Sequence, residues 1–253
     1  MKKRIKLFFT FIILVSAMAF PAWAVESGTM SSEGVFNKNS IKTSQFSSFG
    51  YLLYTPADAV KNMPLIVYLH GGSGKGNDLS MLIADDSFPK YLANGELGEI
   101  PAYVIIPQMP SDVKGWVYIG ESINELINSV CRRYGIDTNR VSLTGHSMGG
   151  TGTWELAIKY PQLFSCIAPL SGAVQKTQSN IAVLQSLPVW AFVGTNDTIV
   201  QPDYSRSFIS GLKEINNFAE ITEFNGAGHF DVPSLTYLSS DISLVEWLLS
   251  HSK

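Results

Sequence analysis

Short apolar runs alternate with longer amphipathic stretches along most of the chain. Several of the short runs are apolar at every position, which is typical of strands covered on both faces. The clearest amphipathic stretch has apolar residues at helical spacing from Ile123 to Val130 and ends at Gly135. Further helices are expected directly after Ser147, over about residues 203–216 and around Trp247. The strand candidates are Gly50–Tyr54, Leu65–Leu69, Ala102–Ile106, Val141–Thr144, Cys166–Leu170, Val189–Val193 and Ala219–Phe224. This alternation predicts an α/β fold with a mostly parallel sheet.

The first 24 residues have the pattern of an export signal. Basic residues at positions 2, 3, 4 and 6 precede a 14-residue apolar run from Leu7 to Phe20, and an Ala-x-Ala site ends at Ala24. A membrane-spanning helix needs roughly 20 apolar residues. We therefore expect residues 1–24 to be a cleaved signal peptide, with an uncleaved anchor as the alternative. The mature protein is expected to be secreted or periplasmic and not membrane-bound. Residues 25–40, rich in Ser, Asn and Gly, are expected to be flexible, and residues 41–253 to form one domain.

Charge and composition narrow the possible partners. The chain has 18 Lys and Arg against 21 Asp and Glu, and no basic stripe follows the N-terminus, which argues against a nucleic-acid partner. Loss of residues 1–24 would leave a formal net charge of −7. Both cysteines, Cys131 and Cys166, lie in apolar segments expected to be buried, and whether they pair is open. There is no C-x-x-C or H-E-x-x-H motif, and no metal or cofactor is expected.

The window from Val141 to Gly150 carries the most informative motif. A predicted strand leads into Gly145-His146-Ser147-Met148-Gly149, and a helix-forming run follows. A G-x-S-x-G sequence at a sharp strand-to-helix turn projects the serine hydroxyl clear of the sheet, and glycine leaves the space that the turn needs. The helix start adds a partial positive charge where an oxyanion would develop. Ser147 is the candidate nucleophile, the alternative being a tight turn whose glycines serve packing alone.

With this motif the chain resembles the α/β-hydrolases. More narrowly, it is similar to small secreted serine esterases such as feruloyl esterases and polyhydroxyalkanoate depolymerases, and to a neighbouring branch described as peptidases. The likeness extends from Tyr51 to Trp247. It implies a mostly parallel sheet with helices on both faces, no large cap domain, and a catalytic domain over residues 41–253. It also implies the chain order nucleophile, acid, histidine.

Two histidines follow Ser147 and compete for the role of general base. His229 lies in a glycine-rich loop directly after the last predicted strand, whereas His251 is two residues from the end of the chain. His229 is therefore the expected base, which would take the proton from Ser147.

Asp197 is the expected partner of that histidine. It follows the predicted strand Val189–Val193, and ligand-handling loops collect at the carboxyl ends of parallel strands. Its carboxylate would hold the imidazole in one tautomer and stabilise the imidazolium. Asp203 and Asp231 are the alternatives, but Asp203 is expected to start a helix and Asp231 is very close to the histidine in sequence.

Backbone amides of Met148 and Gly72 are the candidate oxyanion donors, with Ser73 as the next choice for the second donor. Gly72 lies in a His-Gly-Gly run that resembles the family's oxyanion loop. His70 and Ser73 could also contact substrate, although a structural role is the alternative for His70. Trp116 follows a P-Q-x-P segment that similar esterases carry near the active-site mouth, so it could contact the acyl or alcohol part, the alternative being packing against the next helix.

The connection from residue 171 to residue 188 is too short for the helical cap of many lipases. An open, shallow cleft is therefore expected. These features favour a secreted carboxylic-ester hydrolase acting through an acyl-enzyme on short-chain or polymer-attached esters, such as acetyl or feruloyl groups on a polysaccharide. A serine peptidase of the same fold and a non-catalytic binding module are the alternatives. The sequence sets no expectation for the oligomeric state.

Overall fold

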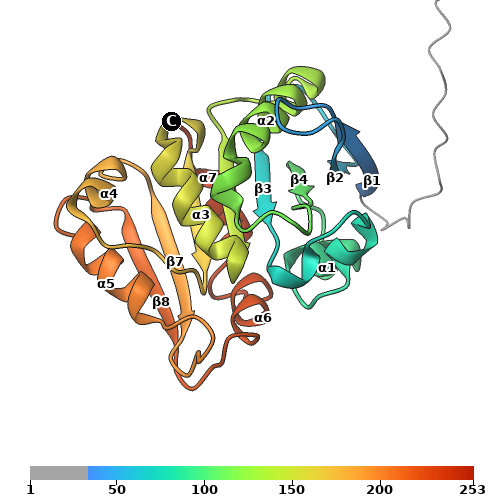
Figure 1. Cartoon of the computed structure of the whole chain (residues 1–253). Coiled ribbons are helices and arrows are strands. Elements are labelled where there is room, and N and C mark those ends of the chain that lie inside the picture. The colour runs from blue at the N-terminus through green and yellow to red at the C-terminus, as the bar shows by residue number, and fades with distance from the viewer. Residues whose placement is uncertain (1–33) are drawn as a thin grey trace, which may run out of the picture.

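The computed structural model describes residues 34–253, which are built around an eight-stranded sheet (Figure 1). The strand order is β1-β2-β4-β3-β5-β6-β7-β8. β2 is antiparallel to β1 and β4, and all other neighbours are parallel. The strands are β1 (Gly34–Ile41), β2 (Phe49–Pro56), β3 (Leu65–Leu69), β4 (Tyr103–Pro107), β5 (Val141–His146), β6 (Cys166–Leu170), β7 (Val189–Gly194) and β8 (Ala219–Phe224). The predicted mostly parallel α/β fold is confirmed.

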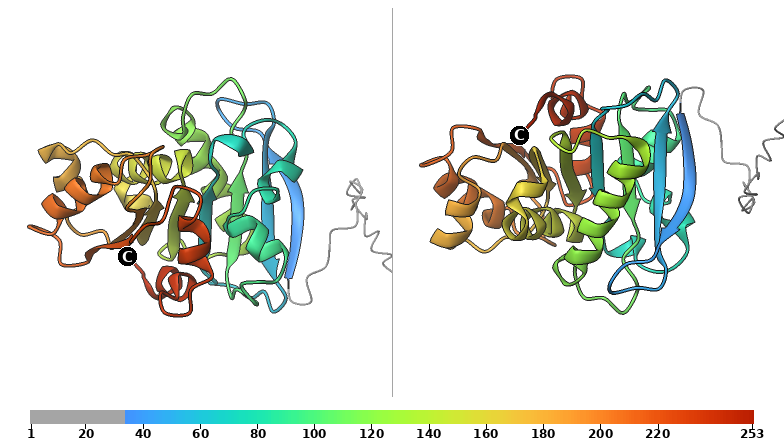
Figure 2. Two further views of the ribbon diagram at one scale, coloured as in Figure 1. Left: turned by 90° about the horizontal axis from the view of Figure 1, so that it is seen from below. Right: turned by 90° about the horizontal axis from the view of Figure 1, so that it is seen from above.

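Helices cover both faces of the sheet. The α-helices are α1 (Phe88–Ala93), α2 (Gly120–Tyr134), α3 (Met148–Lys159), α4 (Gln178–Val183), α5 (Asp203–Leu212), α6 (Val232–Tyr237) and α7 (Leu244–Ser250). Short 3-10 turns are η1 (Gly72–Gly74), η2 (Leu79–Ile83), η3 (Trp116–Ile119) and η4 (Pro161–Leu163). α2, α3, α4 and α5 pack into one apolar core, and α1, α6 and α7 pack into a second core across the sheet (Figure 2).

Alternation along the strands assigns side chains to these two cores. In β3, Leu65 and Val67 belong to the first core, whereas Ile66 and Tyr68 belong to the second. Every β3 residue is therefore buried, which explains the continuous apolar run in the sequence. α2 ends where its pattern predicts, because Gly135 adopts a left-handed conformation (φ 66°) and its amide bonds to the Cys131 carbonyl.

The expected flexible segment is wrong for residues 34–40. These residues form most of β1, which pairs with β2 along its whole length at the edge of the sheet. Main-chain hydrogen bonds can hold an edge strand with few apolar side chains, so the polar composition of residues 37–40 did not reveal it. Residues 25–33 and the expected signal peptide lie outside the described residues. Within residues 34–253, no helix has the length and apolarity needed to cross a membrane.

The two cysteines do not form a disulfide. Cys131 on α2 belongs to the first core and Cys166 on β6 to the second, so the sheet separates them. Both thiols are buried and free, and burial raises the pKa of Cys131 to about 11 and that of Cys166 to about 12. Both side chains act as small apolar groups.

The turn from β5 to α3 depends on very close packing. A Cβ on Gly149 would lie 1.8 Å from the Leu69 carbonyl oxygen, and one on Gly150 would lie 2.2 Å from the Leu170 carbonyl oxygen. The first turn of α3 therefore sits directly on the carboxyl ends of β3 and β6. Because neither neighbour is a flexible side chain, no larger residue fits at these two positions.

The replacement Gly149→Ala should lower the free energy of unfolding by about 3 kcal/mol or more, because the added methyl overlaps a main-chain oxygen. Gly115→Ala is the matched control, since its Cβ would meet nothing closer than 3.8 Å, and it should change stability by less than about 0.5 kcal/mol. Denaturant unfolding of the two variants measures the difference. Equal midpoints would contradict the packing described for α3.

Candidate active site

Ser147 sits at the sharp turn between β5 and α3. Its backbone has φ 61° and ψ −120°, a conformation that costs energy for a residue with a side chain. The strained peptide is held from both sides, because the Ser147 amide donates to the Leu170 carbonyl (3.0 Å) and the Thr151 amide donates to the Ser147 carbonyl (2.9 Å). The turn holds the hydroxyl out toward the carboxyl end of the sheet.

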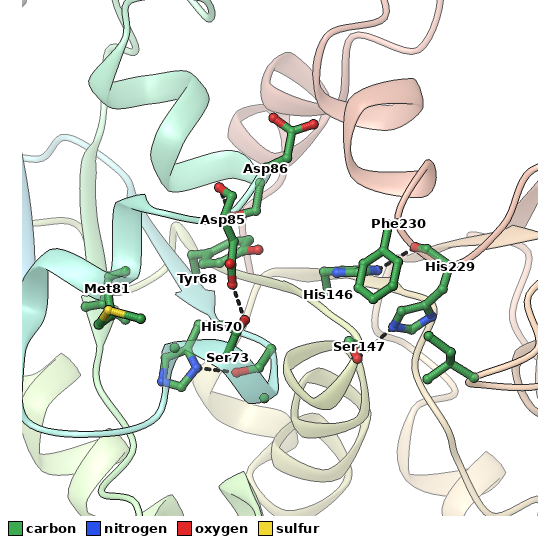
Figure 3. A pocket seen from close by; sticks show the side chains of 16 residues that line it. Tyr68, His70, Ser73, Met81, Asp85, Asp86, His146, Ser147, His229 and Phe230 are labelled. Carbon is green, nitrogen blue, oxygen red and sulfur yellow. Dashed lines mark hydrogen bonds between the residues drawn. The ribbon is translucent and has the colours of Figure 1, made fainter.

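Three side chains are hydrogen-bonded in series at this point. The Ser147 hydroxyl lies 2.8 Å from Nε2 of His229, and Nδ1 of His229 lies 2.7 Å from a carboxylate oxygen of Asp197 (Figure 3 shows the first pair). An ionised carboxylate can only accept, so Nδ1 of the imidazole carries the proton and Nε2 is free to accept from the serine. This series can move the serine proton onto the ring.

Asp197 remains ionised at this buried position. Burial alone would raise the pKa of its carboxyl, but hydrogen bonds from His229 and from the amides of Val200 and Ile199 outweigh burial and leave the pKa below its usual value. Both amides donate to the second carboxylate oxygen at 2.9 Å. One oxygen of Asp197 is thus held by its own loop while the other faces the histidine.

Neither alternative aspartate reaches the ring. Asp203 is the first residue of α5 and pairs with Arg206. Asp231 accepts a hydrogen bond from the Gly228 amide (2.7 Å) and so joins the two sides of His229 in its own loop. Both carboxylates have structural partners of their own.

The loop after β3 passes directly beside the nucleophile. A Cβ on Gly71 would lie 3.6 Å from the Ser147 Cβ. The η1 turn that follows is closed by the amides of Gly74 and Lys75, so the amides of Gly72 and Ser73 have no acceptor within the turn. Met148 is the first residue of α3, and its amide has no acceptor inside that helix. Among residues 34–253, main-chain amides without a hydrogen-bond acceptor therefore lie at the start of α3, directly after Ser147, and in the loop that passes beside it.

His70 holds this loop in shape. Its Nδ1–H donates to the Gly71 carbonyl (2.6 Å), and its Nε2 accepts from the Met109 amide (3.0 Å). Burial lowers the pKa of His70 to about 4, so the ring is neutral near pH 7. Both nitrogens are already used, which fits a structural role and leaves neither nitrogen for proton transfer.

Trp116 does not lie at the mouth of the site. Its side chain is fully buried, its indole N–H donates to the His70 carbonyl (3.2 Å), and a Cβ on Gly152 of α3 would lie only 2.5 Å from it. The expected substrate contact is therefore wrong, and the packing alternative holds. The position of Trp116 shortly after the P-Q-x-P segment indicated the end of the sheet near which it lies. It did not indicate whether the side chain is buried or faces the cavity.

A cavity of about 380 Å³ opens above Ser147 and His229 (Figure 3). The 171–188 connection, which carries α4, contributes nothing to its lining, as expected from its length. The segment from η2 to α1 forms a wall of the cavity instead. Ser73 also lines the cavity, where its hydroxyl donates to Asp85. The wall residues are Met81, Leu82, Asp85, Asp86 and Ser87.

The cavity has acidic side chains on the wall from η2 to α1 and apolar side chains beside His229. Asp86 pairs with Lys90 at 3.4 Å, and Asp85 is held by Ser73. On the histidine side, Ile199 and Phe230 are 58% and 73% exposed and form an apolar rim. Within residues 34–253, no group of three His, Cys, Asp or Glu side chains is arranged to hold a metal ion.

Comparison with known proteins identifies relatives of this chain. A bifunctional acetylxylan esterase/xylanase of Neocallimastix patriciarum is 24% identical over 186 residues, which are 70% of this chain and 25% of the relative. A cutinase of Thermobifida alba is 32% identical over 114 residues, 45% of this chain and 36% of the relative. The chain thus spans only about a quarter to a third of these two proteins.

Solved structures extend the likeness over most of the chain. A thermostable esterase superposes with a TM-score of 0.72 and 25% identity, covering 86% of this chain and 63% of the other. The feruloyl esterase module from Clostridium thermocellum, complexed with sinapinate, has a TM-score of 0.65 and covers 88% of this chain and 90% of the other. At 16% identity, the second likeness shows the shared fold alone. The model of the Esterase family matches residues 53–232. The chain therefore belongs to the Esterase family, within the α/β-hydrolase fold.

Proposed function

We propose that this protein is a serine carboxylic-ester hydrolase with Ser147 as nucleophile, His229 as general base and Asp197 as orienting acid. The observation that carries the proposal is the hydrogen-bonded series from Ser147 through His229 to Asp197, with separations of 2.8 and 2.7 Å, opening on a cavity. Membership of the Esterase family supports the ester as the bond that is cleaved.

The reaction follows from the positions of the protons. Nε2 of His229 accepts the Ser147 proton as Oγ attacks the ester carbonyl carbon, and the amides of Met148 and Gly72 stabilise the oxyanion. The tetrahedral intermediate collapses when the imidazolium returns the proton to the departing alcohol, which leaves an acyl group on Ser147. Water then gives its proton to His229 and attacks the acyl carbonyl carbon. As the bond to Ser147 Oγ breaks, the imidazolium returns that proton to Oγ, which releases the acid and restores the serine hydroxyl.

The substrate is proposed to be a short-chain ester or one attached to a polymer. Support comes from the names of the relatives, which include an acetylxylan esterase, cutinases and a poly(3-hydroxyalkanoate) depolymerase. The expected signal peptide adds a secreted or periplasmic location, where polymer-attached esters would be met. The cavity, without cover from residues 171–188, suits a small acyl group better than a long tail.

A peptidase is the second candidate for the same site. An acylaminoacyl peptidase of Pyrococcus horikoshii shares the fold at 14% identity with a TM-score of 0.65, and this chain covers 41% of it. A triad alone does not distinguish an alcohol from an amine leaving group. An aminoacyl-nitroanilide assayed beside a p-nitrophenyl ester separates the two activities.

Replacing the nucleophile tests the catalytic proposal against a binding module. Ser147→Ala should lower kcat for p-nitrophenyl acetate by about 10⁴-fold or more, because no other group can form the acyl-enzyme. Wild type should react with a fluorophosphonate probe, and the variant should not. Activity within tenfold of wild type would remove Ser147 from the mechanism. A wild type that neither turns over esters nor reacts with the probe would favour a non-catalytic module.

Replacing the acid tests its assignment. Asp197→Asn should lower kcat by about 10⁴-fold, because the amide favours the wrong tautomer of His229. Asp203→Asn and Asp231→Asn are the matched controls and should cost far less. Since the pKa of Asp197 is held below its usual value, its carboxylate should keep its charge, and its bond to His229, on mild acidification. A larger loss in Asp203→Asn would move the acid.

An acyl chain-length series tests the substrate class. Rates on p-nitrophenyl esters of about two to six carbons should exceed those on twelve or more, because each unburied CH₂ of a longer tail forgoes roughly 0.8 kcal/mol. There should be no jump in rate at the substrate's solubility limit. Such a jump, or a preference for long-chain triglyceride, would show that another segment acts as a lid, with residues 77–98 after the oxyanion loop as the candidate, and would exclude the short-chain proposal. Methyl ferulate in the same series compares an aromatic acyl group.

A further inference from the structure

A second histidine, His146, contacts His229 at its main chain and at its ring. His146 is the last residue of β5, directly before Ser147, and is 8% exposed. Its Nε2 lies 2.9 Å from the main-chain carbonyl oxygen of His229, and the two ring centres are 4.6 Å apart at an angle of 40° (Figure 3). His146 therefore touches both the main chain and the ring of the proposed base.

The hydrogen bond to the His229 carbonyl places a proton on Nε2 of His146. A carbonyl oxygen only accepts, so Nε2 of His146 carries a proton. Burial, followed by the nearby charge of His229, lowers the pKa of His146 to about 4, although Asp197 and Asp85 act in the opposite direction. The ring is thus a neutral donor near pH 7 and places no second positive charge beside the imidazolium that forms during turnover.

The loop that carries His229 is held by hydrogen bonds at the residues before the base. The Ala227 carbonyl accepts from the Asn196 amide (2.9 Å), and the Gly228 amide donates to Asp231 (2.7 Å). Within residues 34–253, His146 is the hydrogen-bond partner of the His229 main chain itself. Gly226 adopts φ 78°, its amide donates to the Thr195 hydroxyl (2.8 Å), and its carbonyl accepts from the Asn196 side chain (3.2 Å). These bonds hold the start of the loop, and the bond from His146 holds residue 229.

We propose that His146 is a positioning residue that holds His229 at its carbonyl while the adjacent Ser147 meets the same residue at Nε2. This inference rests on the proposed function of the triad. Because residues 146 and 147 are covalently neighbours, both contacts move with the β5–α3 turn, and the serine-to-imidazole distance is set by one rigid piece of main chain. A displacement of about 1 Å at such a pair can cost on the order of 10²-fold in rate.

Two variants separate the donor from the ring. His146→Gln retains an N–H donor near the Nε2 position and loses the ring, whereas His146→Phe retains a ring and loses the donor. His146→Phe should lower kcat for p-nitrophenyl acetate by about 10- to 100-fold and the rate of fluorophosphonate labelling in parallel, with KM within about twofold. His146→Gln should recover kcat to within about fivefold of wild type. His251→Phe, which removes a histidine bonded to the Trp247 carbonyl, is the control and should leave both rates unchanged.

Each other outcome overturns the proposal. Wild-type kcat in His146→Phe, or equal losses in both variants with unchanged unfolding midpoints, would show that the donor does not position the base. If His146→Phe does not fold, His146→Asn replaces it, because its amide is too short to reach the carbonyl. An active, labelled wild type with an unaffected His146→Phe would reject this inference alone, whereas an inactive, unlabelled wild type would reject the proposed function with it.

Discussion

The position of the nucleophile depends on how closely α3 approaches the ends of β3 and β6. Hydrogen in place of a side chain at Gly149 and Gly150 lets the helix start within contact of two carbonyl groups. That approach forces the strained Ser147 backbone, and two hydrogen bonds to neighbouring main chain hold the strain in place. Every other group at the site is positioned relative to this turn.

Burial keeps two of the three histidines near the cavity in the neutral form. His70 and His146 are both buried beside the cavity and both have a pKa lowered to about 4, so they serve as neutral hydrogen-bonding groups. His229 differs because a carboxylate faces its Nδ1 and a hydroxyl faces its Nε2. Three imidazoles within one small region thus have different hydrogen-bond partners, and these partners support a different proposed role for His229.

Much of this arrangement could be predicted from the pattern of residues, and the exceptions have physical reasons. Fully apolar runs such as Leu65–Leu69 indicated the central strands, because a strand buried on both faces needs an apolar side chain at nearly every position. β1 was missed because an edge strand is held by main-chain bonds that side chains do not report. The G-x-S-x-G motif predicted Ser147, and loop position with chain order predicted Asp197 and His229. The structure brings the three side chains together, and their catalytic roles stay a prediction. The depth of Trp116 depends on packing between distant segments, which spacing along the chain does not encode.

The bond between Ser73 and Asp85 joins two parts of the cavity that are usually considered separately. Ser73 belongs to the loop that carries the proposed oxyanion donor, and Asp85 belongs to the wall that faces the substrate. A redesign of the wall to admit a different acyl group would therefore also shift the amides that are proposed to stabilise the oxyanion. Under the proposed mechanism, the choice of substrate and the rate of bond cleavage are therefore linked through this one hydrogen bond.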